Sequence, residues 1–204
     1  MHKQTYQYVE NKVLTVSQFG FRRQRETAQA VLAFLRNIKE GESNRYHAAI
    51  FIDIKKAFDT VSHELLLQKL DILGIRGMEN QWFRNYLMDR TQSTIIGSSR
   101  SQHRKISCGV PQGSILGPLL FLIYINDMPR ATELLSILFA DDTTYQISSN
   151  SLVELQRKAN EELKRAEQWF NANYLTLHPK KRDTSFSNLI KRKTKQTTHK
   201  SSYT

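Results

Sequence analysis

The sequence between residues 134 and 142 reads Leu134-Leu135-Ser136-Ile137-Leu138-Phe139-Ala140-Asp141-Asp142. A run this apolar predicts a buried strand, and two neighbouring carboxylates at its end repel one another unless cations neutralise them. Residues 143–147 have the pattern of a returning strand, which makes Asp141 and Asp142 the tip of a hairpin. The two acids are therefore candidate metal ligands, and ordinary turn chemistry is the alternative for an isolated pair.

A second apolar strand also carries a carboxylate near its end. Residues 46–54 read Tyr46-His47-Ala48-Ala49-Ile50-Phe51-Ile52-Asp53-Ile54. A lone acid at a strand end is usually a helix cap or a turn residue, but Asp53 does not directly precede an obvious helix. We therefore expect Asp53 to need partners, and Asp141 and Asp142 end a similar strand.

The composition is that of one globular domain with appendages: 204 residues, 39% of them hydrophobic. The single cysteine, Cys108, has no internal disulfide partner and is predicted to be a small buried hydrophobe. The start of the chain carries no apolar segment typical of a signal peptide, and the apolar run 115–125 is too short to span a bilayer. We therefore expect an intracellular protein, in the nucleus or cytoplasm, that is neither secreted nor inserted in a membrane.

The charge is strongly positive, at +11, and much of it lies at the end of the chain. Residues 178–204 hold eight Lys or Arg residues against one acid, and their apolar pattern collapses, so we expect a disordered tail. Such a surplus favours a polyanionic partner such as nucleic acid, although basic tails also serve solubility or localisation.

The remaining pattern predicts helices and hairpins around these two strands. No periodicity is evident before residue 17, and a helix from Thr27 places Ala28, Val31, Leu32, Leu35 and Ile38 on one face. Helices are also expected after the cap Ser62, over 115–125 and after Ser151, and a short strand over 174–177. A further helix is expected to bury one face, made of Met78, Trp82, Phe83, Tyr86 and Leu87. A hairpin is expected after it, with its turn at Gly97-Ser98-Ser99.

Four stretches in this order resemble the reverse transcriptases of non-LTR retrotransposons, such as the LINE and jockey-like elements of animals. Each resembles one motif of the family. They read Gln18-Phe19-Gly20-Phe21-Arg22, Phe51-Ile52-Asp53-Ile54-Lys55-Lys56-Ala57-Phe58-Asp59, Gly109-Val110-Pro111-Gln112-Gly113-Ser114-Ile115-Leu116-Gly117-Pro118 and Phe139-Ala140-Asp141-Asp142.

The resemblance implies an α+β fold, namely a right-hand polymerase palm in which an antiparallel sheet is backed by helices. It implies partial fingers over residues 1–45, the palm over 46–177, the basic tail over 178–204, and no thumb. On this basis Asp53, Asp141 and Asp142 would hold two Mg²⁺ ions, with Mn²⁺ as the alternative. One ion would lower the pKa of the primer 3′-hydroxyl, and the other would bind the triphosphate and stabilise the departing pyrophosphate.

The same resemblance implies further contacts with an RNA template, a DNA primer and dNTPs. Gln112 and Gly113 would contact the incoming nucleotide or the template, and Arg22 would lie along the template path. Phe58 would stack under the sugar and exclude a 2′-hydroxyl, with core packing as its alternative. Lys181 matches a lysine that would serve as general acid, although the residues around it depart from the family pattern.

The implied function is RNA-directed DNA synthesis. One alternative is a catalytically silent, nucleic-acid-binding remnant of such an element. A nucleotide cyclase with the same palm topology is disfavoured, because Pro111-Gln112-Gly113 and the paired aspartates suit polymerases. Because the thumb and some fingers strands are missing from the sequence as given, we expect it to polymerise poorly by itself. The sequence does not indicate an oligomeric state.

Overall fold

The structure is a computed structural model that describes residues 2–40 and 45–178. Its α-helices are α1 (His2–Lys12), α2 (Thr27–Glu40), α3 (His63–Ile72), α4 (Gly77–Leu87), α5 (Leu116–Tyr124) and α6 (Leu152–Ala172). Its strands are β1 (Tyr46–Ile52), β2 (Thr91–Gln92), β3 (Ile95–Ile96), β4 (Ser99–Arg100), β5 (Arg104–Lys105), β6 (Leu135–Phe139) and β7 (Asp142–Ser149). Short 3₁₀ turns, η1 (Ala57–Asp59) and η2 (Met128–Arg130), follow β1 and α5.

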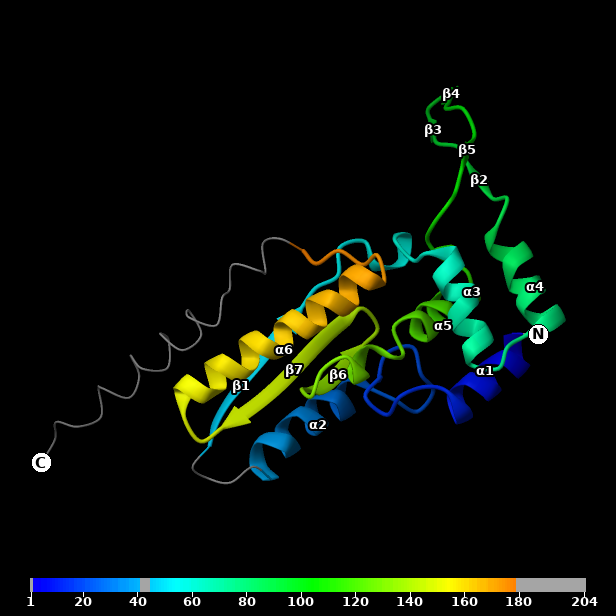
Figure 1. Ribbon diagram of the computed structural model, residues 1–204. Helices are drawn as coiled ribbons and strands as arrows, with labels where there is room; N and C mark the ends of the chain where they lie inside the picture. The colour runs from blue at the N-terminus through cyan, green and yellow to red at the C-terminus, as the bar shows by residue number, and fades with distance from the viewer. Residues whose placement is uncertain (1, 41–44, 179–204) are drawn as a thin grey trace, which may run out of the picture.

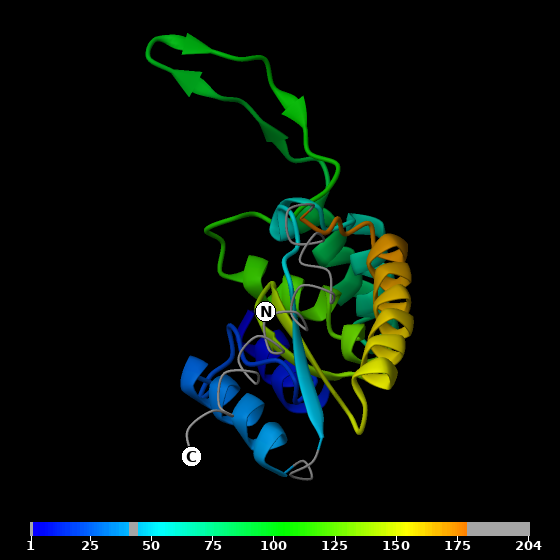
Figure 2. The same cartoon turned by 90° about the vertical axis from the view of Figure 1, so that its left-hand side faces the viewer.

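The centre of the fold is a three-stranded antiparallel sheet in the order β1-β7-β6. Helices α2 and α6 cover opposite faces of this sheet (Figure 1, Figure 2). Ile137 of β6 packs with Ala30 of α2, whereas Ile147 of β7 packs with Leu155 of α6. Side chains alternate between the faces of a strand, so this apolar pattern fixes the register of the sheet.

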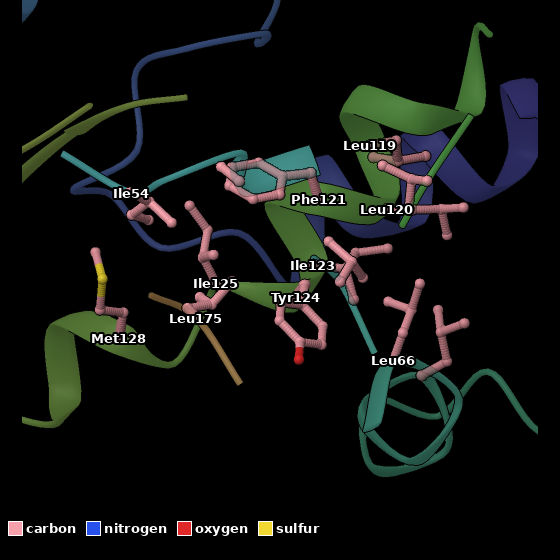
Figure 3. Close-up of a cluster of buried hydrophobic side chains, with 14 of the residues drawn as sticks. Ile54, Leu66, Leu119, Leu120, Phe121, Ile123, Tyr124, Ile125, Met128 and Leu175 are labelled. Atoms are coloured by element: carbon pink, nitrogen blue, oxygen red, sulfur yellow. The ribbon is translucent and has the colours of Figure 1, made fainter. Parts of the chain in front are cut away.

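The main core gathers around α5, a helix that is apolar on every side because it is surrounded by protein. Figure 3 shows its side chains meeting Ile54, Leu66, Met128 and Leu175. The hydroxyl of Tyr124 donates a hydrogen bond to the carbonyl of Asn173 at 2.6 Å, and burial raises the pKa of Tyr124. The neighbouring α3 starts as predicted, since the Ser62 hydroxyl accepts a hydrogen bond from the Leu65 amide at 3.4 Å.

Several expectations about the elements and their buried residues were wrong. Residues 2–12 form α1, whose packing rests mainly on the fully buried Val9, too little to give a periodic signal. In α4, Phe83 and Leu87 are buried as predicted, but Met78 is 86% exposed because it lies in the first turn, away from the core. Cys108 is exposed rather than buried. The expected strand 174–177 is reduced to one bridge between Leu177 and Ile54.

Helix α2 has the predicted start, but its predicted apolar face is not its buried face. Val31, Leu32 and Leu35 are 51%, 61% and 44% exposed. The packing is made instead by small and aromatic residues on the other side, Ala30, Ala33 and Phe34. No helix within residues 2–40 and 45–178 has the length and apolar character required to cross a membrane.

Candidate active site

The two adjacent aspartates lie where the sequence predicts them, at the hairpin between β6 and β7. Phe139 pairs with Asp142, so Ala140 and Asp141 are the two residues of a tight turn. Ala140 has φ +58°, a conformation that a two-residue hairpin turn often demands and that glycine usually supplies. An alanine there costs roughly 1 kcal/mol or more of local strain, which other contacts must offset.

Asp53 lies at the same end of the sheet as this turn. Ile52 is the last residue of β1 and pairs with Thr143 of β7, so Asp53 directly follows this pair on one strand and Asp142 directly precedes it on the other. Beyond Ile52 the chain turns to a different partner, since the Asp53 carbonyl accepts a hydrogen bond from the His178 amide at 2.9 Å. The register therefore brings the three predicted acids to one edge of the sheet.

The carboxylates at this edge suit a hard cation. Asp53 and Asp141 are half-buried and Asp142 is exposed. Within the described ranges the side chains of Asp141 and Asp142 make no hydrogen bond or ion pair, and no three His, Cys, Asp or Glu side chains lie close enough together to enclose an ion. Mg²⁺ is usually held by one or two carboxylates together with substrate phosphates, so an incomplete protein cage fits this ion. That all three aspartates bind metal stays a prediction.

An upstream residue holds the turn in place. The Oε1 atom of Gln18 accepts hydrogen bonds from the backbone N–H groups of Gly20 and Ala140, at 2.8 and 3.1 Å. Its Nε2 donates to the Ala140 carbonyl at 3.4 Å, and the side chain is buried. The Phe19 amide and the Ser17 carbonyl add two 2.8 Å hydrogen bonds to Leu138. The segment around Gln18 thus runs beside the end of β6 and clamps the turn.

Gly20 is essential to this close approach. A Cβ atom on Gly20 would lie 2.1 Å from the Ala140 nitrogen, a contact that no side chain can tolerate. Sequence reasoning quoted Gln18 and Gly20 as part of a family motif but missed their role. The spacing Gln-Phe-Gly carries no sign of a contact with a turn more than a hundred residues away.

Arg22 follows this segment and is engaged inside the protein. It forms a bidentate ion pair with Glu10 of α1, in which Nη2 donates to Oε1 at 2.8 Å and Nε donates to Oε2 at 3.2 Å, and its side chain is 7% exposed. It also donates to the Thr15 and Gln18 carbonyls at 2.8 and 3.2 Å. Arg22 therefore fixes the path of the chain before the clamp, and its predicted place along the template stays a prediction.

Phe58 occupies a half-buried position in η1. Its ring stacks on Phe121 of α5 with a centroid separation of 4.4 Å, and Phe21 meets its edge at 6.0 Å. The packing alternative raised by the sequence is therefore real, but it leaves part of the ring accessible. The assignment of Phe58 to sugar selection stays a prediction.

The glycine-rich loop before α5 is tied to the segment that follows Asp53. The Gly109 amide donates to the Val61 carbonyl at 2.7 Å, and the Val110 amide donates to the Phe58 carbonyl at 2.8 Å. A Cβ atom on Gly109 would lie 2.9 Å from the Asp59 carbonyl oxygen, so the two segments touch at the backbone.

Two loop residues expected to contact the nucleotide or template are exposed. Gln112 donates from Nε2 to the Asp59 carboxylate at 2.8 Å, and Gly113 has φ +79° with open space where a Cβ would project. A shallow pocket of about 280 Å³ adjoins the loop, lined by Tyr6, Phe21, Arg22, Arg23, Ile115, Pro118 and Leu119. Lys181, the predicted general acid, and residues 179–204 of the predicted tail lie outside the described residues.

Comparison with known families gives a match over nearly the whole chain. Residues 1–201 match the family described as reverse transcriptase (RNA-dependent DNA polymerase). The chain belongs to this family. Members of the reverse transcriptase family depend in general on a divalent metal and bind an RNA template and nucleotides.

Relatives of this reverse transcriptase chain include polymerases of mobile elements. It is 32% identical to a probable RNA-directed DNA polymerase from transposon BS of Drosophila melanogaster, over 84% of the chain and 20% of the relative. It is also 32% identical to the RNA-directed DNA polymerase from mobile element jockey of the same species, over 78% of the chain and 18% of the relative. These matches confirm the resemblance to non-LTR retrotransposons, and the chain spans about a fifth of the length of these relatives.

Solved structures agree on the fold. Telomerase from Candida albicans superposes on 87% of this reverse transcriptase chain with a TM-score of 0.59 and 10% identity, over 33% of its own length. Telomerase from Candida tropicalis gives a TM-score of 0.58 and 14% identity over 81% of this chain and 31% of its own. The predicted α+β fold, a polymerase palm with an antiparallel sheet backed by helices, is confirmed. The division into domains at residues 45 and 177 stays a prediction.

Proposed function

We propose that this chain is the catalytic part of an RNA-directed DNA polymerase of a non-LTR retrotransposon. It would join a nucleotide from a dNTP to a DNA primer on an RNA template. The observation that carries the proposal is the register of the sheet, in which the end of β1 that precedes Asp53 pairs with the start of β7 that follows the Ala140-Asp141 turn. Acids from separate strands at one edge are the arrangement that a metal-dependent transfer of phosphate groups requires.

In the proposed reaction the primer 3′-oxygen forms a bond to the α-phosphorus of the dNTP, and the bond to pyrophosphate breaks. Two Mg²⁺ ions would supply the positive charge that favours both the attacking and the departing oxygen. Asp53, Asp141 and Asp142 would hold these ions, and the clamp from Gln18 would keep the turn from shifting. Since misplacement by about 1 Å can lower such a rate on the order of a hundredfold, this rigidity matters for the chemistry.

Two loop residues and one aromatic would position the nucleotide. Gln112 is exposed, and its side-chain amide donates a hydrogen bond to Asp59. Asp59 is also exposed, so a nucleotide or template group can replace it as the acceptor. Gly113 leaves the backbone open to close approach. The accessible part of Phe58 would lie under the sugar. We also propose an intracellular site of action, in nucleus or cytoplasm, with which the exposed free thiol of Cys108 agrees.

The test is single-turnover addition of one dNTP to an RNA-templated DNA primer. The protein is in excess, so that weak binding of the primer–template does not mask nucleotide addition. We expect Mg²⁺-dependent addition by the wild type and none by Asp53→Asn or Asp141→Asn. Glu161→Gln, which also removes one acid but lies on the exposed side of α6, should leave addition unchanged.

A second readout concerns the ions alone. Mn²⁺ binding, followed by electron paramagnetic resonance, should weaken in Asp141→Asn but not in Glu161→Gln. The proposal would be overturned if wild type and Asp141→Asn added nucleotide equally. It would also fail if the wild type bound the primer–template and Mn²⁺ without adding any nucleotide, a result that favours the silent, nucleic-acid-binding remnant.

A further inference from the structure

Residues 90–106 form a hairpin arm that stands away from the rest of the fold (Figure 1, Figure 2). Within it β2 pairs with β5 and β3 pairs with β4, and none of these strands joins the three-stranded sheet. An isolated two-stranded hairpin is only marginally stable in water. An arm with so little support from the body is suited to contact with a partner.

The charge of the hairpin arm identifies the kind of partner. Residues 90–126 contain no Asp or Glu, and four cations lie on the arm: Arg90, Arg100, Arg104 and Lys105. All four are exposed. Lys105 pairs with Asp89 at 2.9 Å, but both side chains are largely exposed, and such surface pairs contribute little. Within the described part of the chain Arg100 and Arg104 have no acidic partner. The arm is therefore complementary to a polyanion.

The tip of the hairpin arm is apolar but not aromatic. Ile95 and Ile96 are 60% and 78% exposed. Single-stranded nucleic acids are usually gripped by aromatic side chains on which bases stack, and residues 89–108 contain no Phe, Tyr or Trp. Aliphatic side chains flanked by cations are instead typical of proteins that enter the minor groove of a duplex. The composition favours a double-stranded ligand.

The root of the hairpin arm connects it to the candidate active site. The Ile106 amide donates to the Arg90 carbonyl at 2.9 Å and closes the base of the arm. Cys108 then bridges Ser62, and the chain reaches Gln112 four residues later. Seven residues from Thr91 to Gly97 extend about 20 Å, which matches about six phosphates along one strand. A duplex held at the active site can therefore continue along the arm.

We propose that the hairpin arm binds the RNA–DNA hybrid, with Arg100 and Arg104 on backbone phosphates and Ile95 and Ile96 in the shallow minor groove of its A-like form. The proposal rests on the proposed function, because the hybrid is the product of RNA-directed DNA synthesis. It adds a contact surface outside the site of chemistry. Binding is measured without dNTPs, so the proposal can fail or stand independently of whether the chain extends a primer.

The test compares equilibrium binding of the whole chain to a 20-base-pair RNA–DNA hybrid and to the single-stranded RNA alone, over a range of salt concentrations. The arm variant is Arg100→Ala with Arg104→Ala. The matched control is Lys158→Ala with Lys164→Ala, which removes the same charge from exposed positions of α6. Because the arm pairs only with itself, the thermal unfolding of the body should not change in the arm variant.

We expect the arm variant to bind the hybrid more weakly and to make the slope of log affinity against log salt shallower by about two. The control should alter the slope by much less. Ile95→Ser with Ile96→Ser should weaken hybrid binding on the order of tenfold at an unchanged salt slope.

Three results would overturn the proposal. The first is equal hybrid affinity and salt slope for the arm and control variants. The second is an equal loss of single-stranded RNA and hybrid binding in the arm variant, which would remove the preference for a duplex. The third is unchanged hybrid binding after both sets of arm substitutions, which would leave the arm as a surface for another class of partner.

Discussion

The side chain of Gln18 hydrogen-bonds both the amide and the carbonyl of Ala140, at 3.1 and 3.4 Å, across 122 residues of chain. Ala140 adopts a positive φ that glycine would adopt more readily, and it immediately precedes the paired acids. The hydrogen bonds from Gln18 therefore offset the backbone strain at Ala140, the residue that positions the two carboxylates that follow it.

Replacing Gln18 with Met keeps the length of the side chain and removes its acceptor. The amides of Gly20 and Ala140 would then be buried without partners, at a cost of about 2–5 kcal/mol in the free energy of unfolding. Urea denaturation measures this loss, and hydrogen exchange at the Ala140 amide should speed up. The matched change Gln156→Met, on the exposed side of α6, should be nearly neutral. Equal stability of the two variants would contradict the clamp.

Gly20→Ala tests the close approach separately from the hydrogen bonds. The new Cβ would meet the Ala140 nitrogen, so the turn must shift, and we expect a destabilisation of about 2–3 kcal/mol or more. Gly77→Ala is the comparison, because Gly77 has φ +58° but open space around it. Strain alone there should cost roughly 1 kcal/mol. Thermal unfolding that ranked Gly77→Ala as the more damaging change would argue against steric contact at Gly20.

Replacement by phenylalanine should have opposite effects on stability at two buried tyrosines. The Tyr145 hydroxyl is buried and, among the described residues, has no hydrogen-bond partner, whereas the Tyr124 hydroxyl donates to the Asn173 carbonyl. Tyr145→Phe should therefore stabilise the fold by about 1 kcal/mol, and Tyr124→Phe should destabilise it by about 1 kcal/mol. The unfolding free energies at neutral pH check the two signs.

The difference in stability between wild type and Tyr145→Phe should depend on pH, because only the tyrosine can ionise. Burial raises the pKa of Tyr145 well above 10.0, its ordinary value. The folded state therefore keeps a proton that the unfolded state loses, and wild-type stability falls as the pH rises above about 10. The advantage of Tyr145→Phe over wild type should widen in that range. A constant difference between pH 8 and 11 would show that the hydroxyl ionises as readily in the folded state.

Phe58 can be tested for sugar selection once nucleotide addition is measured. Phe58→Ala should lose stacking on Phe121 and cost about 1–3 kcal/mol of stability, since the ring is half-buried. It should also relax discrimination against rNTPs, whereas Phe58→Tyr should keep it. If Phe58→Ala lowered stability but left the ratio of dNTP to rNTP use unchanged, the residue would serve packing alone.

Local signals in the sequence predicted much of this fold. The cap at Ser62, the apolar run of α5 and the hairpin ending in Asp141 and Asp142 each depend on residues close together in the chain, and each was found. Helix α1 and the exposed face of α2 were not anticipated, because they depend on which surface the rest of the fold offers.

The candidate site likewise has features that local sequence predicts and contacts that it does not predict. The positions of the three acids follow from strand ends, which the sequence marks clearly. The contact of Gln18 with Ala140 and the pairing of Gln112 with Asp59 join segments far apart in the chain. Neither has a signature in residue spacing, so only the resemblance to a family drew attention to these residues.

The distance along the chain between Gln18 and Ala140 also sets the order in which the protein is completed during synthesis. At about 5–20 residues per second, the ribosome adds Ala140 roughly 6–24 s after Gln18. Throughout that interval the glutamine has no turn to hold. The catalytic edge can therefore assemble only after residues 140–142 have been added, and an interrupted translation product ending before residue 140 would carry Asp53 but no active site.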